Sequence, residues 1–170
     1  MKYKSIIPLL LSIFVPLLAF GESHGAKSAV LDKGDFVGIS FWLATAMMLA
    51  ATVFFFIERD RVKGKWKTSL TVAGLVTGVA FWHYLYMREV WVTEGTSPTV
   101  FRYIDWLITV PLQIVEFYLI LAAVTKVSAN VFWKLLIGSL VMLIGGYVGE
   151  TNEVYKTSGF VVGMIGWVYI

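Results

Sequence analysis

Residues 100–124 read VFRYIDWLITVPLQIVEFYLILAAV, an apolar run interrupted by one base and two acids, Arg102, Asp105 and Glu116. A helix needs about 20 mostly apolar residues to cross the hydrocarbon core of a bilayer, so this run is long enough to span one. A charged side chain in that core costs a few kcal/mol or more, and ionisable residues there usually serve a function. The run therefore predicts a transmembrane helix that carries an ion or proton pathway.

The composition places the whole chain among all-α membrane proteins. Of its 170 residues, 58% are hydrophobic and 15% are charged, which is too apolar for a soluble enzyme of this length. The net charge of +3 comes from basic residues that cluster in predicted loops, which indicates membrane topology and no binding of nucleic acid. The chain has no cysteine and no cluster of His and Glu at ligand spacing, so we expect no metal site.

The N-terminus resembles a secretory signal. Lys2 and Lys4 precede an apolar segment, residues 6–20, and small residues before Glu22 suit cleavage. We therefore expect residues 1–21 to be a signal peptide and residues 22–170 to form the membrane domain. The alternative is that the segment stays as a first span, although it is short for one.

Apolar runs divide the rest of the chain into spans. The predicted spans are A (36–57), B (70–90), C (100–124), D (131–148) and E (from 159). Span E has 12 residues up to Ile170, too few for a crossing. We therefore expect the chain to be a fragment of a larger helical bundle.

Basic residues in the short loops predict the orientation. Five lie between spans A and B, and the same side has Lys126 and, at the start of span D, Lys134. The other side has two, Arg88 near the end of span B and Lys156 before span E. The richer side belongs in the cytoplasm. The mature N-terminus should then lie outside, in agreement with a cleaved signal.

The sequence also carries two local packing signals and one turn signal. Gly74-x-x-x-Gly78 in span B and Gly145-x-x-x-Gly149 in span D predict close helix approach. Residues 91–99 contain β-formers around a Glu-Gly pair and predict a small hairpin between spans B and C.

The polar residues of span C fall on one stripe. Asp105 lies three residues after Arg102 and four before Thr109, so the three side chains share a face of a helix. Glu116 lies eleven residues beyond Asp105, a rotation within ~20° of the same direction and a rise of ~16 Å. One acid beside a guanidinium and another among aliphatic side chains suit a proton acceptor in the outer half and a donor toward the cytoplasm.

His83 adds a third titratable group at the depth of the outer acid. It lies about as far from the outer end of span B as Asp105 does from the outer end of span C, so the two could pair across the interface. Each residue has a plainer explanation: Arg102 alone could snorkel to the interface, and His83 alone could be an ordinary helix–helix contact. Their shared face and matched depth favour a function.

The motifs of the chain resemble the proteorhodopsin branch of the microbial rhodopsins. The matching segments are Phe81-Trp82-His83-Tyr84, Arg102-Tyr103-Ile104-Asp105-Trp106, Thr109-Val110-Pro111-Leu112, Glu116-Phe117-Tyr118 and Gly146-Tyr147-Val148-Gly149-Glu150. The resemblance runs from about residue 35 to residue 170. It implies a seven-helix bundle of which helices A–D and part of E are present. It also implies a light-driven outward proton pump in which all-trans retinal is bound to a lysine of the last helix.

The resemblance assigns roles to residues of this chain. It makes Asp105 the proton acceptor and counterion, Glu116 the proton donor and His83 the partner of the acceptor. Arg102 would assist proton release, and Thr109 completes the proton-pump signature. Trp106, Met142 and Trp167 would contact retinal, and Gln113 occupies a colour-tuning position where Gln goes with blue absorption. The family also implies a homo-oligomer, a pentamer or hexamer.

The lysine that binds retinal is missing from the chain, because every lysine present lies in a loop, at a helix end or before span A. We therefore expect this polypeptide by itself neither to bind retinal covalently nor to pump. Two alternatives stay open: a photosensory rhodopsin that signals to a partner, and an unrelated ion transporter. A sensor has no need of a fast cytoplasmic donor such as Glu116, and no inverted repeat supports a transporter.

Overall fold

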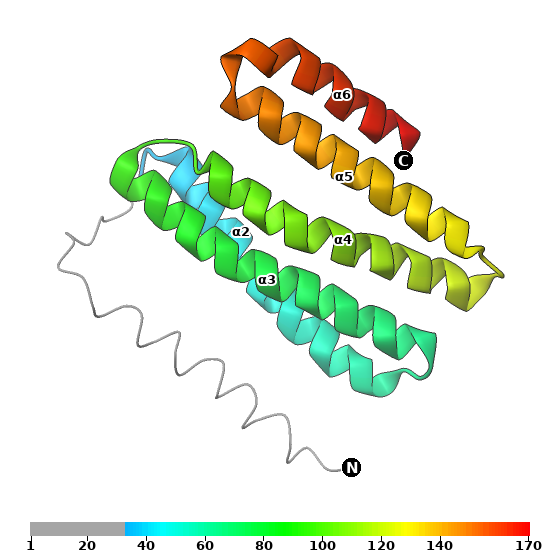
Figure 1. Ribbon diagram of the computed structural model, residues 1–170. Helices are drawn as coiled ribbons and strands as arrows, with labels where there is room; N and C mark the ends of the chain where they lie inside the picture. Colours follow the sequence, from blue (N-terminus) through cyan, green and yellow to red (C-terminus); the bar gives the residue numbers. More distant parts are fainter. Residues whose placement is uncertain (1–32) are drawn as a thin grey trace. The chain divides into compact units, whose positions relative to one another are not determined.

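The computed structural model describes residues 33–170, whose regular elements are all helices (Figure 1). The predicted signal peptide lies outside the described residues. The helices are α2 (Phe36–Glu58), α3 (Lys65–Glu94), α4 (Thr99–Val124), α5 (Ala129–Thr151) and α6 (Lys156–Tyr169), with short 3-10 turns at Arg59–Arg61 and Glu153–Tyr155. Helices α2 to α5 are long and apolar enough to cross a membrane. The all-α membrane fold predicted from the sequence is confirmed.

Consecutive helices are neighbours in the bundle. Helix α2 packs on α3, α3 on α4, α4 on α5, and α5 on α6. Short connections force this order, because a loop of a few residues cannot carry the chain past an adjacent helix. The order matters for the site, because it places α4 between the helix that carries His83 and the helix that carries Glu150.

The hairpin predicted between spans B and C is wrong. Helix α3 continues through this segment to Glu94, and residues 33–170 contain no strand. Gly95 ends the helix in the left-handed conformation, with φ of 68°, and its N–H donates to the carbonyl of Trp91. Glycine adopts this conformation without the steric cost that a Cβ brings, so the Glu-Gly pair marks a helix end and not a hairpin turn.

Asp35 joins the start of α2 to the end of α3. Its carboxylate accepts a hydrogen bond from the N–H of Gly38 at 2.9 Å, which caps the helix. The same carboxylate accepts hydrogen bonds from the indole N–H of Trp91, whose Nε1 lies 3.0 Å from Oδ2 and 3.2 Å from Oδ1. One acid therefore sets both the first turn of α2 and its register against α3.

Glycines let the backbones of α5 and α6 approach each other. A Cβ built on Gly145 would lie 2.9 Å from the nitrogen of Gly163, and one on Gly149 would lie 3.1 Å from the nitrogen of Phe160. The close approach predicted for the glycines of span D is confirmed. In α3, Gly74 faces the Phe56 ring of α2. The absence of a side chain at Gly74 therefore makes room for an aromatic ring, whereas in α5 it makes room for the backbone of α6.

Candidate functional site

Asp105 and Thr109 occupy the buried face of α4. The side chain of Asp105 is 4% exposed, and Thr109 is buried one turn further along. The Thr109 hydroxyl donates to the backbone carbonyl of Asp105 at 2.9 Å, so its own polar group is satisfied within the helix. A buried carboxylate in an apolar span is costly unless it is paired or serves a function.

His83 of α3 faces Asp105 across the helix interface. Its Nδ1 atom lies 3.2 Å from Oδ1 of Asp105 and 3.0 Å from the carbonyl oxygen of Val79, one turn back on α3. A single ring nitrogen therefore has two acceptors within reach. Oδ1 of Asp105 is buried and accepts no well-formed hydrogen bond from the residues described, because the approach of His83 is close but poorly aligned.

Arg102 is not paired with Asp105, although the sequence suggested that the two would interact. Its guanidinium donates to Oε1 of Glu150, near the end of α5. The hydroxyl of Thr99 donates to the same oxygen at 3.2 Å. The reason is tertiary: α5 brings a second carboxylate to the N-terminal end of α4, and the side chain of Arg102 extends toward it.

Asp105 opens onto a cleft of about 740 Å³ that several helices share. Its lining is mostly aromatic and aliphatic. The predicted site residues on this lining are Asp105, Trp106, Thr109, Gln113, Met142 and Trp167, and Tyr84, Tyr103, Gly146 and Phe160 lie on it too. The structure thus brings together residues from all five helices, α2 to α6, that are up to 119 positions apart in the sequence, as between Met48 and Trp167.

Glu116 lies apart from this cleft. It is half-buried on α4, about two turns beyond Thr109, and forms no ion pair or hydrogen bond within residues 33–170. Its neighbours in sequence are the buried Ile114 and the exposed Phe117. The two acids of α4 therefore have different surroundings, as the stripe of polar residues suggested.

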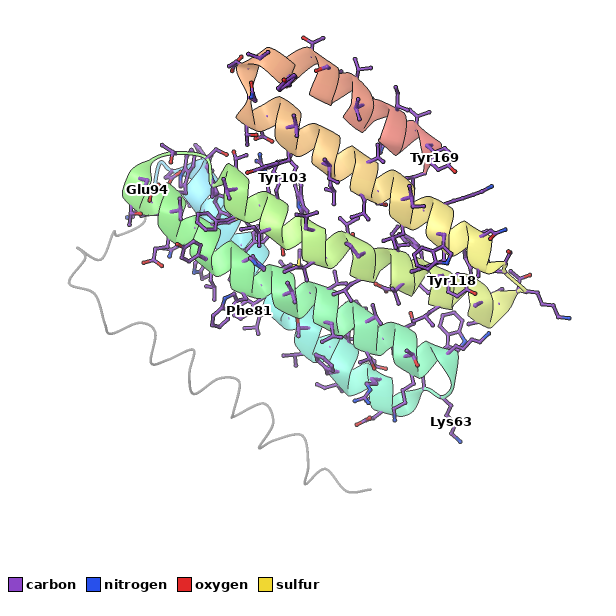
Figure 2. All side chains as sticks on the ribbon, viewed as in Figure 1. Lys63, Phe81, Glu94, Tyr103, Tyr118 and Tyr169 are labelled. Carbon is purple, nitrogen blue, oxygen red and sulfur yellow. The ribbon has the colours of Figure 1, made fainter. Side chains whose placement is uncertain are left out.

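Two residues of the site were not singled out from the sequence. Glu150 binds Arg102, and the buried Tyr103 packs its ring against Trp106 and Tyr147, with both pairs of centroids 5.1 Å apart. Figure 2 shows Tyr103 between α4 and α5. A usable signal existed for Glu150: it is an acid at the C-terminal end of span D, and antiparallel neighbours place that end beside the start of span C.

No group of three or more His, Asp or Glu side chains in residues 33–170 could hold a metal ion. The candidate site is thus an apolar cleft with one carboxylate on its wall and one imidazole beside that carboxylate, and an ion pair between Arg102 and Glu150 lies at the N-terminal end of α4. Such a cleft suits a long apolar ligand that carries one positive charge, because the carboxylate would balance that charge.

A sequence profile of the family described as bacteriorhodopsin-like protein matches residues 35–170. The blue-light absorbing proteorhodopsin of Gamma-proteobacterium Hot 75m4 is 65% identical over 148 residues, which are 87% of this chain and 59% of that protein. The green-light absorbing proteorhodopsin of Gamma-proteobacterium EBAC31A08 is 59% identical over 162 residues, 95% of this chain and 64% of that protein.

Solved structures give the same result. The crystal structure of a blue light-absorbing proteorhodopsin from Med12 superposes with a TM-score of 0.71 at 69% identity, and covers 79% of this chain and 64% of that chain. The rhodopsin of Exiguobacterium sibiricum superposes with a TM-score of 0.68 at 34% identity, over 78% of this chain and 61% of that chain. The chain therefore spans about three fifths of the length of these relatives.

Proposed function

Because the chain belongs to the bacteriorhodopsin-like protein family, we propose that it is part of a light-driven outward proton pump that uses all-trans retinal. The observation that carries the proposal is the buried Asp105 carboxylate beside His83, on the wall of an apolar cleft inside a membrane span. Family membership also removes the unrelated ion transporter from the alternatives. A classical enzyme activity is not part of the proposal.

The residues of the cleft fit retinal. Trp106, Met142 and Trp167 supply the apolar walls that a polyene needs, and Gly146 keeps a side chain out of the space beside Tyr103. The buried Oδ1 of Asp105 has acceptor capacity left for a cationic group. When bound, retinal would supply the absorption of visible light and a proton that light makes available. No lysine lines the cleft within the described residues, so we expect the covalent linkage to need a residue from outside this chain.

We assign a different step of proton transfer to each of several residues of this chain. We assign Asp105 as counterion and proton acceptor, because it is the carboxylate on the cleft wall. His83 can share the accepted proton through Nδ1, 3.2 Å away. Glu116 would deliver a proton from the cytoplasmic half of α4, and Arg102 would guide release at the outer end. Thr109 holds the turn of α4 that positions Asp105, through its bond to the carbonyl of that residue.

The position of Gln113 on the cleft supports absorption of blue light, since glutamine accompanies blue absorption in the family and the blue-absorbing relative is 65% identical. The four apolar helices make the chain a multi-pass membrane protein. We further propose the inner (cell) membrane of a bacterium, a mature N-terminus on the outside, residues 1–21 as a cleaved signal, and a pentamer or hexamer.

Light-driven acidification tests the proposal. The complete reading frame that encodes these residues would be expressed in cells, supplied with all-trans retinal and illuminated in unbuffered medium. We expect the medium to become more acidic, and Asp105→Asn to abolish this while an absorption band remains, shifted to longer wavelength at alkaline pH. A pigment that does not acidify the medium would point to the photosensory alternative. Undiminished acidification by Asp105→Asn would exclude Asp105 as the acceptor.

A further inference from the structure

Glu150 gathers the polar groups at the outer end of α4. Its Oε1 accepts a hydrogen bond from the guanidinium of Arg102 and one from the hydroxyl of Thr99. The hydroxyl of Tyr103 also interacts with this carboxylate. Three side chains from the first two turns of α4 thus converge on one acid of α5.

The position of the Arg102 guanidinium connects this cluster to the cleft. Its Cζ atom lies 5.4 Å from the centroid of the Trp106 ring and 6.0 Å from that of the Tyr103 ring, distances at which a cation and an aromatic face attract each other. Both rings line the cleft. The charge of Arg102 is therefore held against two side chains of the cleft wall, near enough to affect a bound chromophore.

Arg102 has a second carboxylate within the span of its own helix. Asp105 lies three residues further along α4, and its Oδ1 atom is 3.2 Å from Nδ1 of His83 in the described structure. The Nε atom of Arg102 and Oδ1 of Asp105 are both buried without a hydrogen bond in residues 33–170. An arginine side chain has enough rotatable bonds to reach either acid, and its planar fork of five donors suits a carboxylate at either position.

We propose that Glu150 is a positioning residue that anchors the guanidinium of Arg102 against Trp106 and thereby keeps its charge off Asp105. The inference rests on the proposed function, since it concerns the same cleft, and it adds a residue to which no role has been given. Glu150 touches neither the cleft nor the Asp105–His83 pair in the described structure, so it would act through Arg102.

Nuclear magnetic resonance on the complete protein tests the anchor without reference to transport. With ¹⁵N-labelled arginine and ¹³C-labelled carboxyl groups, the guanidinium of Arg102 should show a dipolar coupling to a glutamate carboxyl. The coupling should vanish in Glu150→Gln and persist in Glu150→Asp as a coupling to the new aspartate. A coupling of Arg102 to the carboxyl of Asp105 in the unaltered protein would overturn the proposal.

The absorption maximum of the retinal pigment tests the consequence. Glu150→Gln should shift the maximum in the unaltered background and leave it unmoved in an Arg102→Gln background, because the effect passes through Arg102. Glu153→Gln is the matched control: it removes one outer acid that pairs with Lys156 and not with Arg102, so it should shift neither spectrum. An equal shift from Glu150→Gln in both backgrounds, or none in either, would refute the positioning role.

These results are separable from those on the pump. A pigment that fails to acidify the medium contradicts the proposed function, yet its absorption maxima still report on Glu150. If a variant fails to form a pigment, the resonance measurement on the unaltered protein decides the question by itself. Conversely, acidification together with an Arg102–Asp105 coupling would keep the pump and reject the anchor.

Discussion

Replacing Gly159 with alanine should weaken the contact between α5 and α6. A Cβ on Gly159 would lie 2.5 Å from both the Cα and the nitrogen of Gly149, and 2.6 Å from the carbonyl oxygen of Gly145. Ordinary contacts of a Cβ begin at 3.4 Å, so the new methyl group is short of room by about 0.9 Å. All three neighbours are backbone atoms, which cannot rotate away, so the two helices must move apart.

The cost follows from that separation. A gap of 0.5–1 Å forfeits roughly a quarter to a half of the dispersion energy of the atoms that face each other. Overpacking of a well-packed contact costs about 1–3 kcal/mol. Because the α5–α6 contact at Gly159 is made by backbone against backbone, we expect a loss of about 2–3 kcal/mol in the free energy of unfolding. The higher helix propensity of alanine offsets little, because membrane helices stay folded when they separate.

Titration of the pigment with a denaturing detergent, followed by loss of the visible absorption band, measures this free energy. Gly78→Ala is the matched control: its Cβ would meet the Thr52 side chain at 3.4 Å, an ordinary contact, and should change the free energy by less than about 0.5 kcal/mol. If Gly159→Ala unfolded within the same margin of the unaltered protein, the backbone contact would not limit stability and the reasoning would fail.

Three further predictions concern the pigment. Glu116→Gln should slow the late photocycle, because an amide cannot deliver the proton; flash photolysis measures the decay, and a normal rate would remove Glu116 as donor. Gln113→Leu should shift the absorption maximum to longer wavelength, since Gln113 lines the cleft; an unmoved maximum would place Gln113 outside the chromophore's environment. The 170 residues expressed alone should yield no visible band with retinal, because no lysine lines the described cleft, and a stable band would contradict this.

Much of the fold could be predicted because hydropathy depends on local sequence. In a bilayer each backbone polar group must be satisfied within its own helix, so a long apolar run has few alternatives to a spanning helix. The predicted span C, residues 100–124, and the observed α4, Thr99–Val124, coincide within one residue. Span B was predicted shorter than α3 because its polar ends continue as helix beyond the apolar run, where hydropathy carries no signal.

The end of α3 was mispredicted for a related reason. The Glu-Gly pair at residues 94–95 is compatible with a hairpin turn and with a helix end, since both use a glycine with positive φ. Local sequence could not choose between them. The structure has a helix end at this point. Helix α3 continues along α2 as far as Glu94, and the indole of Trp91 in its last turn donates to Asp35, 56 residues away in the sequence.

The sequence by itself determined the spanning helices and the face of α4 that carries Arg102, Asp105 and Thr109, because helical periodicity fixes which side chains share a side. The tertiary structure decided the partners. It places His83 beside Asp105 and pairs Arg102 with Glu150. It also forms the cleft from helices that are distant in the sequence. An ion pair forms with whichever charge the packing of neighbouring helices brings within reach, and that distance is not encoded in the spacing of residues along one helix.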